Sequence, residues 1–162
     1  MKAHHCPVCD MEVLSSSISA EHYGILYFFC SDQCRENFIS RSSLYVGDKS
    51  QKKLGKQEIK KRSFTLDKPV SKSNTQALES MLTGMMGVHD VLIADAKISI
   101  TYDLLQVTAL QIEKELERSG NRLGIGWGGR LKRGWVHYTE ENELEILAEN
   151  DAPCCNKPPA KG

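Results

Sequence analysis

The sequence has no excess of charge of either sign, because its 21 basic and 21 acidic residues leave a formal net charge of zero. Nucleic-acid-binding domains are usually strongly basic, so this balance argues against a nucleic-acid partner. No apolar run approaches the length that crosses a membrane, and the first residues lack the apolar stretch of a secretory signal. We therefore expect a soluble, cytoplasmic protein that does not insert into a membrane.

Sequence patterns of catalysis are missing as well. The chain offers no Ser-His-acid set, and the glycine-rich segment 124–129 lacks the Lys-Ser/Thr pair of a phosphate-binding loop. A cysteine nucleophile would have to come from residues that are better placed as metal ligands. We expect a protein that is not an enzyme.

Four of the six cysteines form two closely spaced pairs, Cys6/Cys9 and Cys30/Cys34, with 20 residues between the pairs. A Cys-x-x-Cys turn directs two thiolates at one ion, and residues four apart share one face of a helix. Four thiolates suit a tetrahedral ion such as zinc, held at about 2.3 Å. The spacing predicts a metal site with Zn²⁺ as the expected ion and Cu⁺ as an alternative.

The residues around the second pair support this prediction. The apolar and aromatic segment 22–29 indicates strands that lead directly into Cys30. Ser31 is a candidate helix N-cap, and a helix N-terminus lowers the pKa of a nearby thiol. His4 and His5 are candidate additional ligands, although histidines at a chain end are more often solvated.

Two alternatives stay open at this point. Six cysteines are an even number, which also fits a disulfide framework, but the metal-ligand spacing and the expected compartment favour a metal. A site closed by four thiolates is often structural, so the ion either holds a small module together or is carried and passed on.

The segments Pro7–Val13 and Tyr27–Ser31, together with Cys34, Phe38 and Tyr45, resemble a YHS domain of the wider TRASH group. The resemblance implies a role in heavy-metal trafficking, resistance or sensing for a module spanning residues 1–47. Two positions depart from the family pattern: Cys6 stands where an aspartate is usual, and Ser42 where a proline is usual. The first departure completes the four-cysteine set.

Residues 48–61 are rich in lysine and poor in large apolar residues. We expect a solvated basic linker here, partly helical from Ser50 to Lys60 and leaning on an acidic helix near the carboxyl end. A nucleic-acid patch is the weaker interpretation because no aromatic residues are interleaved with the lysines.

Residues 62–127 alternate between strand and helix patterns. Strands are expected at 63–66, 88–93, 98–102 and 122–125, with one helix starting at Ser73 or Asn74 and another capped by Thr108. This order predicts a ferredoxin-like βαββαβ domain, and the whole chain is expected to be α+β.

Within this domain, Gly87-Val88, Val91, Ile98 and the segment 100–103 resemble a heavy-metal-associated domain, the unit found in copper chaperones and metal-ATPase amino-terminal modules. The resemblance implies a docking surface for a metal-transporting P-type ATPase or a metallochaperone. The Cys-x-x-Cys of that family is absent, because Ser-Lys-Ser-Asn occupies positions 71–74. Since hydroxyl and amide groups do not replace thiolates for a soft ion, we expect no copper binding at this loop.

The carboxyl-terminal part, residues 128–150, predicts a helix from about Arg130 to Glu149 with a potential interruption near Thr139. Trp127 and Trp135 lie beside basic residues and suit either a membrane surface or packing against the sheet. Residues 151–162 are expected to be a disordered tail, whose thiols, Cys154 and Cys155, are candidates for auxiliary metal capture.

These observations together predict a cytoplasmic heavy-metal-binding accessory protein for zinc or copper(I) trafficking or resistance. The alternative is a structural zinc scaffold or a metal-responsive regulatory protein. The two differ in whether the ion leaves the folded protein.

Overall fold

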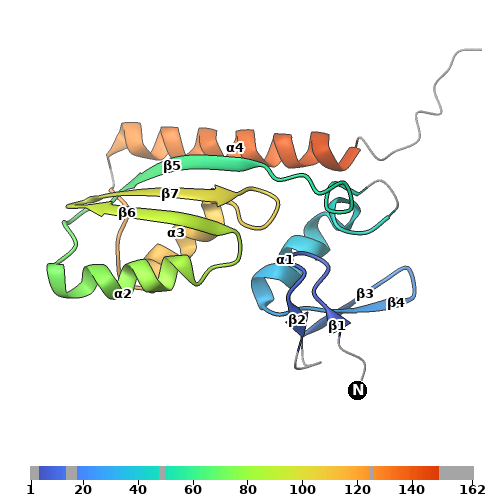
Figure 1. Cartoon of the computed structure of the whole chain (residues 1–162). Helices are drawn as coiled ribbons and strands as arrows, with labels where there is room; N and C mark the ends of the chain where they lie inside the picture. Colours follow the sequence, from blue (N-terminus) through green and yellow to red (C-terminus); the bar gives the residue numbers. More distant parts are fainter. Residues whose placement is uncertain (1–3, 14–17, 48–49, 125, 150–162) are drawn as a thin grey trace, which may run out of the picture.

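The computed structural model describes residues 4–13, 18–47, 50–124 and 126–149. It contains a small amino-terminal module of paired strands and one helix, a three-stranded antiparallel sheet with helices, and a long carboxyl-terminal helix (Figure 1). The expected α+β class is confirmed.

The amino-terminal module is built from two short hairpins and a helix. β1 (His4–His5) pairs with β2 (Glu12–Val13), and β3 (Ser19–His22) pairs with β4 (Ile25–Phe28). Helix α1 (Asp32–Ser40) and the 3₁₀ turn η1 (Ser42–Leu44) follow. Phe38 is the centre of its apolar packing, with ring centroids 4.9 Å from Tyr27 and 5.1 Å from Phe29. These apolar side chains belong to one buried cluster that also includes the core of the second unit.

The second unit has the element order strand, helix, strand, strand, helix. Its elements are β5 (Ile59–Thr65), α2 (Lys72–Thr83), β6 (Val88–Ala94), β7 (Lys97–Asp103) and α3 (Ala109–Arg118). The strands lie in the order β5-β7-β6, all antiparallel. Alternate residues of β7, namely Ile98, Ile100 and Tyr102, are fully buried on one face.

Two local features position the helices of this unit. α3 begins with a capping box in which Thr108 accepts from the Gln111 backbone and the Gln111 side chain accepts from the Thr108 backbone. Gly87, which follows α2, has a φ of +86°, and a Cβ there would lie 2.5 Å from the Gln106 Cβ. Only glycine fits this turn without displacing the loop after β7.

The expected fourth strand at 122–125 is absent as a strand from the described residues. The chain returns beside the end of β5 only through an isolated bridge between Leu66 and Leu123. The backbone hydrogen bond from Gly124 N–H to Thr65 O, 2.9 Å long, is part of the same contact. Because glycines follow at 124, 126, 128 and 129, the segment lacks the side chains that would extend a strand.

Helix α4 (Trp127–Glu149) runs alongside β5, at the edge of the sheet where a fourth strand would otherwise lie (Figure 1). It starts three residues before the expected boundary and is not interrupted near Thr139, whose hydroxyl donates to the Val136 carbonyl inside the helix. Lys60 of β5 donates to Glu143 of α4 over 2.6 Å. The edge of β5 is therefore covered by a helix.

The segment expected to be a solvated linker is in part packed. Ser50 and Gln51 are buried, the chain forms turns after them, and β5 begins at Ile59, because the backbone pairs there with Asp103. Gln51 Nε2 donates to the carbonyl oxygen of Leu147 over 3.2 Å. This segment therefore connects the amino-terminal module to the end of α4.

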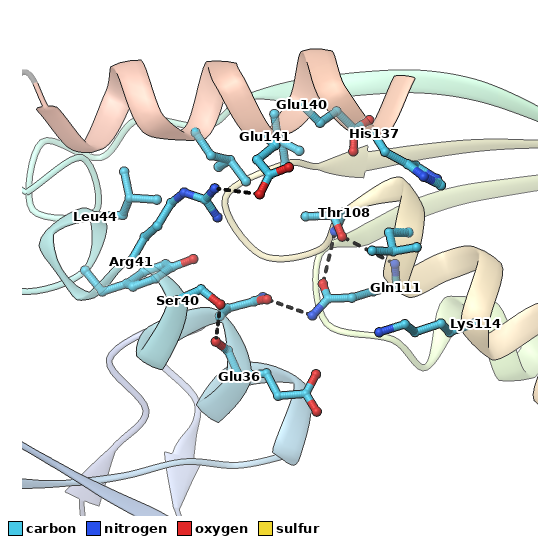
Figure 2. Close-up of a pocket in the computed structure, with 15 residues that line it drawn as sticks. Glu36, Ser40, Arg41, Leu44, Thr108, Gln111, Lys114, His137, Glu140 and Glu141 are labelled. Carbon is cyan, nitrogen blue, oxygen red and sulfur yellow. Dashed lines mark hydrogen bonds and ion pairs between the residues drawn. The ribbon is translucent and has the colours of Figure 1, made fainter. Parts of the chain in front are cut away.

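Amide side chains hold α1 against the second unit. Gln33 Nε2 donates to the carbonyl oxygens of Met86 at 2.9 Å and Gln106 at 3.0 Å. One turn later, Asn37 donates to the Gln106 carbonyl at 2.6 Å and accepts from Gln111 Nε2 at 2.7 Å. Figure 2 shows Gln111 reaching from α3 towards α1. The module and the sheet are thus fixed relative to one another.

A buried carboxylate fixes α4. Glu140 is 2% exposed and accepts hydrogen bonds from the Tyr102 hydroxyl and, over 2.8 Å, from the Ala109 N–H, with Arg62 Nε 3.6 Å away. Burial, followed by this hydrogen bond, raises the pKa of Tyr102 and keeps its hydroxyl a donor. One side chain therefore links α4 to β7 and to the start of α3.

We expect the substitution Glu140→Ala to lower the free energy of unfolding by about 3 kcal/mol, because it leaves a buried hydroxyl and a buried N–H without an acceptor. Glu140→Gln keeps an acceptor and should cost less. The neighbouring Glu141→Ala is the matched control, since this exposed side chain should change stability by less than about 0.5 kcal/mol. Urea unfolding followed by circular dichroism measures all three, and equal losses for Glu140→Ala and Glu141→Ala would contradict the assigned role.

Candidate metal centre

The structure brings the sulfur atoms of Cys6, Cys9, Cys30 and Cys34 together. All four lie within 4.8 Å of one another, and all four cysteines are free thiols. Cys6 and Cys34 are completely buried, whereas Cys9 and Cys30 are half-buried. Two chain segments separated by 20 residues thus meet at one point.

The first pair lies on a tight turn between β1 and β2. The Asp10 N–H donates to the Cys6 carbonyl over 2.9 Å, and the Cys6 N–H donates to the Met11 carbonyl over 2.9 Å. Asp10 closes the turn with a φ of 69°, a left-handed conformation that aspartate tolerates better than most residues. The turn directs both sulfurs to the same side.

The second pair lies where β4 ends and α1 begins. Ser31 is the N-cap, with extended backbone angles, and its hydroxyl oxygen accepts from the Cys34 N–H over 3.3 Å. Asp32 adds a negative charge to the first turn, where it is favourable. Cys30 therefore precedes the helix and Cys34 lies in its first turn, as the spacing predicts.

The sulfur positions fit a tetrahedral ion. Sulfurs held about 2.3 Å from one centre in a tetrahedron lie about 3.8 Å apart. Here the Cys9 and Cys30 sulfurs are 3.3 Å apart, and those of Cys30 and Cys34 are 3.6 Å apart. The four-thiol cluster could bind a metal ion such as zinc, with all four cysteines as ligands.

Mutual hydrogen bonding already favours a negative charge in the cluster. Hydrogen bonds from Cys34 and then from Cys9 lower the pKa of the Cys6 thiol well below its usual range, and donating to Cys6 raises the pKa of Cys34. For Cys9, a hydrogen bond to Cys34 lowers the pKa, but the interaction with Cys6 and burial outweigh it and raise the pKa to about 12. One thiolate is thus stabilised by protonated neighbours. A metal ion replaces those protons, so its binding releases them.

His4 and His5 lie outside the group of side chains that could share an ion. The His4 ring packs on Phe28, with centroids 4.5 Å apart, and His5 Nδ1 lies 3.1 Å from the Asp10 carbonyl oxygen. Within the described residues, the only such group is the four cysteines. Cys154 and Cys155 lie outside the described residues.

The Ser-Lys-Ser-Asn stretch at 71–74 is remote from the four-thiol cluster. Ser71 precedes α2 and its hydroxyl pairs with that of Ser73 over 3.1 Å. α1 contacts the end of the sheet where Asp103 pairs with Ile59, whereas the connection from β5 to α2 follows the opposite end (Figure 1). The Ser-Lys-Ser-Asn stretch therefore does not supply ligands to an ion held by the four cysteines.

Sequence reasoning missed two contacts that brace the cluster. Lys52 Nζ donates over 2.6 Å to the carbonyl of Val8, inside the first cysteine turn. The buried Tyr45 hydroxyl donates over 2.7 Å to the Leu105 carbonyl, across to the second unit. The lysine run and the tyrosine were visible in the sequence, but their partners are backbone carbonyls, which no sequence pattern marks.

We expect the tag-free protein to bind one zinc ion per chain and the substitution Cys30→Ser to weaken binding by more than about a hundredfold. Loss of a supporting partner alone commonly costs 10–100-fold, and loss of a ligand should cost at least as much. Metal analysis after dialysis against a competing chelator measures both. The matched control is the double substitution Cys154→Ser with Cys155→Ser, which should keep one ion per chain. An unchanged ion content in Cys30→Ser would contradict the four-thiol site.

Substitutions of the N-caps of α1 and α3 separate effects on zinc binding from effects on overall stability. Ser31→Ala should lower stability by about 1 kcal/mol and also weaken zinc binding several-fold, because its hydroxyl orders the turn between Cys30 and Cys34. Thr108→Ala removes the cap of α3 and should cost similar stability without changing zinc affinity. Chelator competition and urea unfolding of both variants test this. Equal zinc affinities of Ser31→Ala and Thr108→Ala would contradict the role of Ser31 in ordering the cysteine turn.

No described helix is both long enough and apolar enough to span a membrane. Comparison of the chain with protein-family models, with curated proteins and with solved structures gives no match. The four-sulfur geometry therefore carries the functional conclusion.

Proposed function

We propose that the protein is a cytoplasmic heavy-metal-binding accessory protein with no catalytic activity of its own. Its four-thiol cluster would hold zinc, with copper(I) as the alternative ion. The convergence of the four cysteine sulfurs within 4.8 Å is the observation that carries this proposal. Four clustered thiolates suit a soft or borderline metal ion, and reduced thiols suit the cytoplasm.

Unequal burial of the four cysteine residues supports a site from which the ion can leave. Cys6 and Cys34 are fully buried, but Cys9 and Cys30 are half-buried. A cavity of about 220 Å³ lies beside Cys9 and is lined in part by Lys52 and Lys56. An incoming thiol or chelator could approach one ligand first and displace the ion stepwise, through a cavity whose lining carries both signs of charge, since Asp10 and Asp103 border it as well.

The second unit supports a partner from the metal-transport machinery. Its element order, its strand order β5-β7-β6 and the single bridge from Leu66 to Leu123 suit a ferredoxin-like unit with a reduced last strand. The end of this unit around Ser71 is not covered by the amino-terminal module. We propose that it docks a metal-transporting P-type ATPase or a metallochaperone, in keeping with the resemblance to heavy-metal-associated domains.

A structural role is the second candidate, and one observation favours it. The cysteine-bearing helix α1 is fixed to the second unit through Gln33 and Asn37, so an ion at Cys34 would also order the contact between the two parts. In that case the zinc would be a staple within an interaction scaffold or a metal-responsive regulator.

Ion exchange distinguishes the two functions. We expect zinc to pass from the full-length protein to an excess of a chromogenic chelator faster than the module unfolds, because Cys9 and Cys30 are accessible. Amide NMR spectra recorded during the transfer should show that the second unit is unchanged. They should also show that the amino-terminal module is still folded when the chelator has taken up the zinc.

Release only at the rate of module unfolding would support the scaffold and contradict the exchange role. A protein that takes up neither zinc nor copper(I), although its thiols are reduced, would remove both candidates. Lys52→Met is a useful second variant, because losing the hydrogen bond to the Val8 carbonyl should speed release without removing a ligand.

A further inference from the structure

The outward side of α4 carries an apolar stripe that nothing in the described structure covers. Its members are Trp127, Leu131, Trp135, Tyr138 and Ile146, with exposed fractions of 83, 60, 67, 63 and 61%. The spacings of 4, 4, 3 and 8 residues keep them on one side of the helix. At 1.5 Å per residue, the stripe is about 29 Å long.

This stripe is not needed to hold α4 in place. The opposite side of the helix packs on the protein through Val136, Glu140, Leu144 and Leu147, of which Glu140 and Leu144 are buried. The stripe therefore lies on the side of α4 opposite this packed face, with Trp135 at the flank that borders a hollow beside β5. Apolar surface of this extent usually marks an interaction site.

Charge is distributed unevenly along the same helix. Its first half carries Arg130 and Lys132, both exposed and without an ion pair among the described residues, and it contains no acidic residue. Its last turns carry Glu141, Glu145 and Glu149, all exposed. Glu141 and Glu145 lie 3.7 and 3.8 Å from Arg41, but both are more than half exposed, so these contacts are weak.

This uneven distribution of charge distinguishes between two partners for the stripe, an anionic membrane and a second copy of α4. An anionic membrane would attract Arg130 and accept the tryptophans, but a helix lying flat on it would press Glu145 and Glu149 against the lipid head groups. A second α4 running in the opposite direction places the basic half of each helix beside the acidic half of the other. We propose that the stripe is the interface of a homodimer in which two α4 helices pack antiparallel.

The spacing along the helix permits such a pairing. With the two-fold axis between Trp135 and Tyr138, Trp135 of each copy lies on Tyr138 of the other, and Trp127 lies on Ile146. The same register sets Arg130 opposite the turn that carries Glu141 and Glu145, on the same flank of the stripe. The interface is thus self-complementary in shape and in charge, as a two-fold contact requires.

The apolar area suffices for a specific interface. Whole aromatic side chains of 150–250 Å² imply that the three aromatic residues expose on the order of 400 Å² per copy. Two copies, with Leu131 and Ile146 added, exceed the roughly 1,000 Å² expected of a biological contact. The antiparallel arrangement would also put the two four-thiol modules at opposite ends, because each lies near the carboxyl end of its own α4 (Figure 1).

Sedimentation of the full-length, zinc-loaded protein under reducing conditions, from low to high micromolar concentration, tests this proposal. We expect a reversible dimer, and we expect Trp135→Glu to weaken it by more than about a hundredfold, since buried interfacial tryptophans dominate binding. Arg130→Glu should weaken it about tenfold. The triple variant Arg130→Glu, Glu141→Arg, Glu145→Arg should restore much of the loss, because the charges are exchanged across the interface.

The matched control is Leu92→Glu, which adds the same charge at an apolar residue that is 58% exposed on the sheet. It should leave the dimer unchanged. A monomer at every concentration overturns the proposal, as does a dimer that survives Trp135→Glu. Sedimentation with vesicles of phosphatidylserine and phosphatidylcholine is the third arm: binding by a monomeric protein, lost in Trp135→Glu, would assign the stripe to a membrane instead. Zinc content should stay at one ion per chain in all variants, so failure here leaves the metal site unaffected.

Discussion

The amino-terminal module depends on the meeting of four sulfurs. Its two hairpins and single helix enclose few apolar side chains of their own, with Phe38 at their centre, and these form one apolar cluster with the second unit. The sulfurs of Cys6 and Cys34 are fully buried beside this core. An ion shared by four ligands would contribute the free energy that the apolar contacts do not, since ligand binding and folding are one equilibrium in small metal-binding modules.

This constraint reaches the second unit through polar contacts. Gln33, adjacent to Cys34, donates to carbonyls at two loops of the second unit, and Lys52 ties the first cysteine turn to the segment before β5. Buried or half-buried hydrogen bonds of this kind add modest stability but fix orientation, because each partner is costly to leave unsatisfied. Side-chain amides, one ammonium group and the Tyr45 hydroxyl therefore help to fix the position of the four-thiol cluster relative to the sheet.

Much of this arrangement could be predicted from the sequence, and the reasons differ between elements. The cysteine spacing, the N-cap at Ser31 and the alternation in residues 98–102 are local patterns, and local patterns predict local structure. The length of β5 and the burial of Ser50 and Gln51 depend on partners far away in the chain, which the lysine-rich composition does not reveal, whereas residues 53–57 are exposed. The prediction of a last strand at 122–125 was wrong because an apolar pattern does not show how far pairing extends. Only Leu123 forms a bridge, to Leu66, before the glycines begin.

Helix α4 lies where a last strand would pair with β5, and this explains the apolar stripe on the surface. A strand beside β5 would be held by backbone hydrogen bonds and would expose few side chains at the edge. Helix α4 is held instead by Glu140, Glu143 and a narrow apolar face, which leaves its whole outer side free to carry large apolar residues. The pairing with β5 ends at Gly124 and α4 begins at Trp127, so the chain enters a helix where the last strand would continue. The same feature that shortens the sheet therefore creates the stripe from Trp127 to Ile146.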